Sequence, residues 1–132
     1  MVDQPDQHGE LFAGVPYEYA SVVKPGSFVF TAGACPLDES GQVVGADDPI
    51  AQADQCVSNL VRALASAGAT LDDLVRTTIY VVGDQAELAV VWSTVAQRLL
   101  PHRPPSTLLG VRALGYQHQL VEIDGIAALA PD

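Results

Sequence analysis

Two extended segments near the C-terminus constrain the fold of this chain more than any other feature. From Ser106 to Arg112 the residues sort by parity, with one face made of Thr107, Leu109 and Val111. From Leu120 onward one face holds Val121, Ile123 and Ala127, and the opposite face holds Leu120, Glu122, Asp124 and Ile126. Alternation with a period of two is typical of a strand whose two faces differ. If the first set of each strand packs under helices, Ser106 and Glu122 share the other face. That face is then either a site or interface, or a solvent-exposed sheet edge.

Length and charge exclude several functional classes. At 132 residues with 48% hydrophobic residues, the chain predicts one domain with one ordinary core. Sixteen acidic against six basic residues give a net charge of -10, which opposes binding to nucleic acid or to an anionic membrane. No apolar run approaches the roughly 20 residues that span a bilayer, and the polar start MVDQPDQHGE is no signal peptide, so we expect a cytoplasmic protein.

The sequence predicts a chemistry without cofactors. Cys35 and Cys56 form no CxxC pair and have no His-rich partner segment, so two buried thiols are a better interpretation than a disulfide or a metal site. A phosphate-binding glycine loop, a dinucleotide fingerprint and a metal-ligand cluster are also missing from the sequence.

Two helices are predicted from capping residues and apolar stripes. Asp48-Pro49 supplies an N-cap and a first-turn proline, and Gly68 is a typical residue just beyond a helix end. The second helix begins at Asp84 with Glu87 three residues later, and it ends before Pro101. Each helix has an apolar stripe at three- and four-residue spacing, which predicts one buried face.

The remaining elements are strands, and their order predicts an α+β fold. Runs at 18–23 and 27–32 flank Lys24-Pro25-Gly26 and predict a hairpin, followed by a short segment at 42–44 and a central strand at 74–82. The order is β-β-(β)-α-β-α-β-β, with two helices on one face of a mixed sheet. The other face then needs a partner, which predicts oligomerisation. We expect a flexible arm at 1–14 and a single domain at 15–132.

The residues that carry a family resemblance are spread over nearly the whole chain, from about Val15 to Leu129. They are Pro16-Tyr17, Phe28 to Gly33 with Pro36, Gln52 to Gly68, Thr77 to Val82, Arg103 to Pro105, and Leu120 to Ala127. In this order and spacing the chain resembles the YjgF/YER057c/UK114 family, whose best-studied branch is the RidA enamine/imine deaminases. The resemblance implies a chorismate-mutase-like fold and a homotrimer with clefts between neighbouring subunits.

The resemblance also implies roles for individual residues. Glu122 matches the glutamate that orders the attacking water, and Tyr17 matches a tyrosine that lines the cleft, although a packed interface aromatic is an equal alternative for Tyr17. The arginine that grips the substrate carboxylate has no counterpart, because Ser106 stands in its place in Pro104-Pro105-Ser106-Thr107. A serine cannot make the bidentate, charge-assisted hydrogen bonds that an arginine makes with a carboxylate. Arg103 is the better substitute, since Arg112 lies about 20 Å away along a straight strand.

Three further residues are expected to line the cleft: Cys35, Leu108 and Thr31. Cys35 is either a nucleophile, which would need a base or a depressed pKa, or a buried structural thiol. The resulting hypothesis is a homotrimer that processes a small imine or enamine, without the usual carboxylate, through Glu122 as acid and base. The alternative is a non-catalytic trimer that binds a small ligand or regulates. The acidic charge disfavours ribonuclease activity, so we expect neither nucleic acid nor membrane as a partner.

Overall fold

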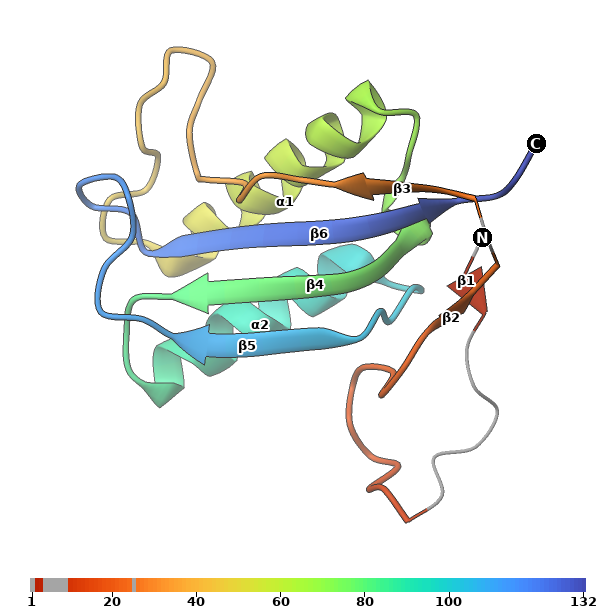
Figure 1. Cartoon of the computed structure of the whole chain (residues 1–132). Helices are drawn as coiled ribbons and strands as arrows, with labels where there is room; N and C mark the ends of the chain where they lie inside the picture. Colours follow the sequence, from red (N-terminus) through yellow and green to blue (C-terminus); the bar gives the residue numbers. More distant parts are fainter. Residues whose placement is uncertain (1, 4–9, 25) are drawn as a thin grey trace.

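The structure is a computed structural model that describes residues 2–3, 10–24 and 26–132. Its main sheet has four strands in the order β3 (Ser27–Phe30), β6 (Val121–Leu129), β4 (Leu74–Val81) and β5 (Ser106–Gly110). β4 and β5 run parallel, and the other neighbours are antiparallel. Both helices, α1 (Pro49–Ser66) and α2 (Gln85–Leu99), lie on one face of this sheet (Figure 1). The predicted α+β fold with a mixed sheet is confirmed.

The helix ends follow the predicted capping residues. The Asp48 carboxylate accepts a hydrogen bond from the Ala51 amide at 3.0 Å, with proline in the first turn. Gly68 follows α1 with a φ of +81°, a conformation that a side chain would strain. The Asp84 carboxylate accepts from the Glu87 amide at 2.9 Å and begins α2.

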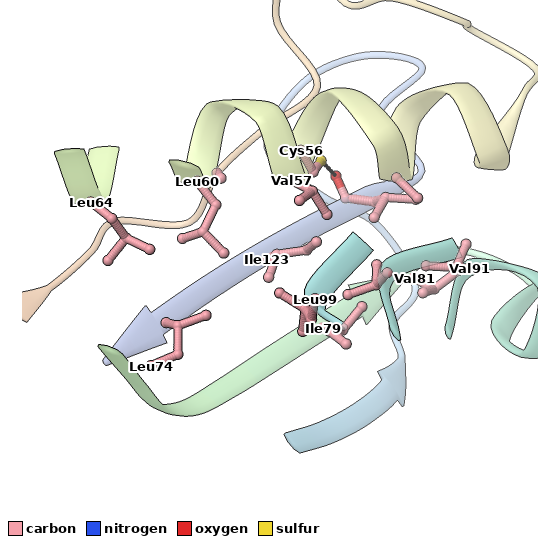
Figure 2. Close-up of a cluster of buried hydrophobic side chains, with 14 of the residues drawn as sticks. Cys56, Val57, Leu60, Leu64, Leu74, Ile79, Val81, Val91, Leu99 and Ile123 are labelled. Atoms are coloured by element: carbon pink, nitrogen blue, oxygen red, sulfur yellow. Dashed lines mark hydrogen bonds between the residues drawn. The ribbon is translucent and has the colours of Figure 1, made fainter. Parts of the chain in front are cut away.

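The hydrophobic core lies between the helices and one face of the sheet (Figure 2). Its fully buried side chains come from α1, α2, β4 and β6 and include Leu60, Leu64, Leu74, Ile79, Val91 and Ile123. The buried Gln52 side chain accepts from the Leu120 amide and donates to the carbonyls of Gly45 and His118, so one amide joins α1 to two loops. In the described part of the chain, no helix has the length and hydrophobicity to cross a membrane.

The predicted N-terminal hairpin is wrong. β2 (Val22–Val23) pairs with β1 (Val2–Asp3), whereas β3 pairs antiparallel with β6, so that Ser27 lies opposite Leu129. The buried strand β6 offers β3 a larger apolar partner than the two-residue strand β2 can. The short strand predicted at 42–44 is reduced to one bridge between Val43 and Leu37. The arm at 1–14 lies partly outside the described residues and stays a prediction.

The face of the sheet away from the helices, which we call the open face, carries polar and aromatic side chains. The register places Glu122 beside Tyr80, and Asp124 beside Thr78. On β3, Phe30 lies opposite Ile126 and has 73% of its surface exposed. Neighbours in register project to the same side, so these three strands present one continuous face.

The register of β5 corrects one expectation from the sequence. Ser106 pairs with Thr77 and Leu108 with Ile79, and both partners on β4 are fully buried under the helices. Ser106 and Leu108 therefore lie on the helix-covered face, opposite to Glu122. Thr107 and Leu109, which pair with Thr78 and Tyr80, lie on the open face. The alternation in β5 was predicted correctly, but the assignment of its two faces was wrong.

Candidate active site

Glu122 lies on the open face with two hydrogen-bond donors directed at one of its oxygens. The Cys35 thiol donates to Oε1 at 3.3 Å, and the Gln119 amide Nε2 donates to the same atom at 3.2 Å. Gln119 belongs to the loop before β6, and Cys35 follows the end of β3. A carboxylate held in this way on a sheet surface is suited to accept and return a proton.

Gly33 makes room for the other carboxylate oxygen. A Cβ built at this position would overlap Glu122 Oε2 and lie 2.5 Å from its carboxyl carbon. A Cβ there would force the Glu122 carboxylate to move, so its observed position depends on the bare backbone of Gly33. This dependence comes from close contact and not from backbone conformation.

The segment that carries Cys35 is fixed from two sides. Ala34 forms a bridge with Ile123, with an N–O distance of 2.6 Å from its amide. From α1, the Asn59 side-chain amide donates to the carbonyls of Cys35 and Leu37. The segment after β3 thereby continues beside β6 and stays in reach of Glu122.

The surroundings of Cys35 favour a protonated thiol. Burial first, and then the hydrogen bond and charge of Glu122, raise the pKa of Cys35 from 9.0 to about 11. A nucleophilic cysteine needs the thiolate. The environment therefore supports the structural interpretation of Cys35 and its use as a hydrogen-bond donor.

A second group of predicted residues lies along the outer edge of β5. A groove with a volume of ≈ 580 Å³ is lined by Pro16, Tyr17, Trp92, Ser106, Thr107 and Leu108. Tyr17 packs edge-on against Trp92 with ring centroids 6.1 Å apart. Glu122 does not line this groove, because β4 and β6 are inside the sheet and β5 is its edge. Within one chain the predicted site residues thus form two separate groups.

The hydroxyls of Ser106 and Thr31 are both used inside the fold. Ser106 Oγ lies in a short contact with Thr77 Oγ1 and donates to the Pro104 carbonyl at 3.0 Å. Thr31 Oγ1 accepts from the Gly125 amide at 2.9 Å, which extends the pairing of β3 with β6. Whether either residue, or Leu108, binds a substrate stays a prediction.

The cations proposed to replace the missing arginine lie away from Glu122. The Arg103 guanidinium donates to the Val15 carbonyl at 2.6 Å, at the outer edge of β5. Arg112 is exposed in the loop after β5. Arg76 of β4 was not predicted from the sequence: its register opposite Ile126 places it on the open face, and Nη2 donates to Thr107 Oγ1 at 2.6 Å.

Sequence reasoning missed Gln119, Asn59 and Arg76. Two features of the sequence could have drawn attention to these residues. Asn59 is a polar residue in a helix with an apolar stripe, and Gln119 lies three positions before Glu122. Neither feature reveals the partner, because Asn59 of α1 contacts the distant segment at Cys35 and Leu37, and the contacts of Gln119 depend on how the loop before β6 folds. Tyr80 was also missed; its hydroxyl donates to Asp124 at 2.9 Å, and this bond, followed by burial, raises the pKa of Tyr80. No group of three or more potential metal-binding side chains occurs in residues 2–3, 10–24 and 26–132.

Comparison with known proteins identifies relatives in sequence and in fold. A "RutC family protein" from Pyrococcus abyssi is 31% identical over 110 residues, covering 75% of this chain and 86% of that protein. The "2-iminobutanoate/2-iminopropanoate deaminase" of Salmonella typhimurium is 38% identical over 76 residues, covering 58% of each chain. A Rid-family protein of unknown function from Yersinia pestis superposes with a TM-score of 0.88 at 30% identity, covering 97% of this chain and 98% of that one. The family model described as "Endoribonuclease L-PSP" matches residues 13–129. The chain therefore belongs to this family, the YjgF/RidA family whose fold and sequence pattern it shares.

Proposed function

We propose that this protein hydrolyses a small imine or enamine intermediate to a carbonyl compound and ammonia, with Glu122 as the group that moves protons. The observation that carries the proposal is the held carboxylate: Oε1 accepts two hydrogen bonds, and Oε2 rests against Gly33 on the open face. The named deaminase relative from Salmonella typhimurium supports the same reaction class.

The reaction needs one base that can also act as an acid. Water adds to the carbon of C=N as Glu122 accepts a proton from it, and the proton passes to nitrogen to give a carbinolamine. Glu122 then takes the proton of the carbinolamine hydroxyl and passes it to the amine nitrogen, so that the C–N bond breaks, ammonia leaves and the C–O bond becomes C=O. A positioned carboxylate contributes roughly 10²- to 10⁴-fold to such a proton transfer.

The proposed substrate lacks the carboxylate of a 2-imino acid. On β5, the residues facing the Glu122 side are Thr107 and Leu109, and neither carries a charge. Among the described residues of the open face, the cation is Arg76, whose guanidinium already bonds Thr107. The carboxylates of Asp124 and Glu122 on the same face would repel the carboxylate of such a substrate.

The two separated groups of site residues favour a cleft that two chains complete. In a homotrimer, the Tyr17 groove of one subunit would face the Glu122 of its neighbour. Exposed Phe30, on the same open face as Glu122, supplies apolar surface for such an assembly. The small-molecule substrate and a second copy of the chain are thus the proposed partners, and the proposed location remains cytoplasmic.

A second function is a non-catalytic, small-ligand-binding or regulatory trimer. The specific observation in its favour is that the described part of β5 places no arginine on the Glu122 face. Such a protein would hold its ligand on the same face without turning it over.

The experiment is ammonia release from freshly generated 2-iminopropanoate and from an imine without a carboxylate. Four proteins are compared: wild type, Glu122→Gln, Thr107→Arg and Ser106→Arg. We expect wild type to hydrolyse the neutral imine, and Glu122→Gln to lose at least about 10²-fold. Thr107→Arg adds a guanidinium on the open face and should raise kcat/KM for 2-iminopropanoate by about tenfold or more.

Ser106→Arg is the matched control, because its guanidinium would start on the helix-covered face. A gain in Ser106→Arg equal to that in Thr107→Arg would contradict the assignment of faces. Wild-type activity on 2-iminopropanoate that Arg76→Gln abolishes would show that Arg76 holds the carboxylate. No turnover by any of the proteins, together with ligand binding, would favour the non-catalytic function.

A further inference from the structure

Glu122 is bound asymmetrically, and the asymmetry distinguishes its two oxygens. Both side-chain donors reach Oε1: the Cys35 thiol at 3.3 Å and the Gln119 amide at 3.2 Å. Among the described residues, no side chain donates to Oε2, which faces the bare backbone of Gly33. A carboxylate held by one oxygen offers the other for exchange with water or substrate.

Gln119 is not free to follow the carboxylate. Its side chain is 3% exposed, and all its polar atoms are engaged. Nε2 donates to the Val121 carbonyl at 3.0 Å as well as to Glu122, and Oε1 accepts from the Tyr116 amide at 3.1 Å. Rotating this amide would break three hydrogen bonds, so Gln119 directs a fixed N–H at Glu122.

The backbone of Cys35 is also fixed, and its thiol lies 3.6 Å from the Gly33 carbonyl as well as 3.3 Å from Glu122 Oε1. The Ala34 bridge to Ile123 and the Asn59 amide on the Cys35 carbonyl hold its backbone. Its thiol keeps its proton at neutral pH, since burial and the charge of Glu122 raise the pKa of Cys35 to about 11. A protonated thiol can only donate toward a carboxylate, so Cys35 and Gln119 act on Oε1 in the same direction.

We infer that Cys35 and Gln119 are positioning residues that anchor Oε1 of Glu122 and leave Oε2 as the oxygen that carries the proton during turnover. The inference rests on the proposed function and names the two side chains, outside the reacting atoms, that orient its acid and base. Two donors that engage the same oxygen fix the orientation of the carboxyl group. Oε2 therefore keeps a constant direction.

Other titratable groups also surround Glu122 and contribute to any pH profile. Asp124 is its neighbour on the same face of β6, and Tyr80 lies opposite it on β4. Cys56 of α1 lies beneath the sheet, where burial first, and the charges of Cys35 and Glu122 next, raise its pKa. None of these groups donates to Glu122 in the described residues, so removing Cys35 or Gln119 isolates the anchoring effect.

The test compares Cys35→Ala with Cys35→Ser. Alanine removes the donor, and serine keeps a hydroxyl donor in the same place. We expect Cys35→Ala to lower kcat about three- to tenfold with little change in KM. Cys35→Ser should restore most of kcat. Wild-type kcat in Cys35→Ala would overturn the inference, as would a Cys35→Ser enzyme as impaired as Cys35→Ala.

A second measurement keeps the inference testable if the proposed reaction fails. The chain has five glutamates, so a sample labelled with ¹³C at the glutamate carboxyls gives few signals, and Glu122→Gln identifies that of Glu122. We expect the chemical shift of this carboxyl to differ from the wild-type value in Cys35→Ala and in Gln119→Met, because each variant removes a donor to Oε1. Identical chemical shifts in the three proteins would overturn the inference, whereas a lack of imine hydrolysis by wild type would overturn only the proposed function.

Discussion

The two faces of the four-stranded sheet differ in role: one packs the hydrophobic core, and the other carries the residues of the proposed site. The helix-covered face packs Leu60, Ile79 and Ile123, all with 0% exposure, and it accounts for the core. The open face carries Glu122, Asp124, Arg76 and the 73% exposed Phe30. One face is covered by the two helices of the same chain, and no helix of the described residues covers the other. Stability and the proposed chemistry are therefore separable by substitutions on one side or the other.

The largest effect is expected on the covered face. Leu60→Ala leaves a cavity in the core and should lower the free energy of unfolding by about 3 kcal/mol. Val61→Ala, the next residue of α1, is the control, because Val61 is 36% exposed and should cost less than about 1 kcal/mol. Urea unfolding monitored by circular dichroism measures both. Equal losses of unfolding free energy in the two variants would show that Leu60 is not part of the hydrophobic core.

Gly33→Ala should damage the open face while sparing the core. Its Cβ would displace the Glu122 carboxylate, and we expect imine hydrolysis to fall about 100-fold, equivalent to about 2.7 kcal/mol in the barrier. Gly115→Ala is the control, because a Cβ there meets nothing within 4 Å. Activity is compared with thermal unfolding. Full activity in Gly33→Ala would show either that Glu122 takes no part in the reaction or that Gly33 does not contact its carboxylate.

Phe30→Asp tests whether the open face joins the chains. A charge in that apolar patch should weaken self-association by about tenfold or more, or about 1.4 kcal/mol. Sedimentation velocity at several concentrations reports the oligomer. The matched variant Val90→Asp changes a 40% exposed residue on α2 and should leave assembly intact. If Val90→Asp dissociates the oligomer and Phe30→Asp does not, the helices and not the open face form the interface.

The smallest effect concerns thiol reactivity. Because the pKa of Cys35 is raised from 9.0 to about 11, the folded chain holds this proton more tightly than the unfolded chain. The resulting stabilisation is fully present below pH 9 and is lost as pH rises through 11. Alkylation of Cys35 should therefore be slow at pH 7.5 and faster in Glu122→Gln, which lacks the charge that helps raise that pKa. If Cys35 in wild type reacted as fast as free cysteine, the raised pKa of its thiol would be contradicted.

Local signals predicted a large part of the fold. Asp48, Asp84 and Gly68 mark helix ends through hydrogen bonds and backbone conformations that are set within a few residues. The alternation in β6 correctly placed Glu122 away from the core. The homotrimer, the arm and the roles of the site residues stay predictions.

The errors share one physical cause: strand pairing over long sequence distances. A turn at Lys24–Gly26 predicts a hairpin, but Ser27 pairs with Leu129 because β6 provides the buried partner. Alternation in β5 defines two faces without saying which is covered, and only its parallel register with β4 places Ser106 beside Thr77. The contacts of Asn59 with the carbonyls of Cys35 and Leu37 also span long sequence distances. Those of Gln119 lie within three residues, and they depend on the conformation of the loop before β6, which the alternation pattern does not define.

The alternating burial of β6 links the register of this strand to the position of the site. A shift of β6 by one residue would turn Glu122 and Asp124 toward Leu60 and Ile79 and expose the apolar residues of the strand. Such a register would bury two carboxylates without partners, which is strongly unfavourable. The register that builds the hydrophobic core therefore also fixes the position of the proposed catalytic carboxylate.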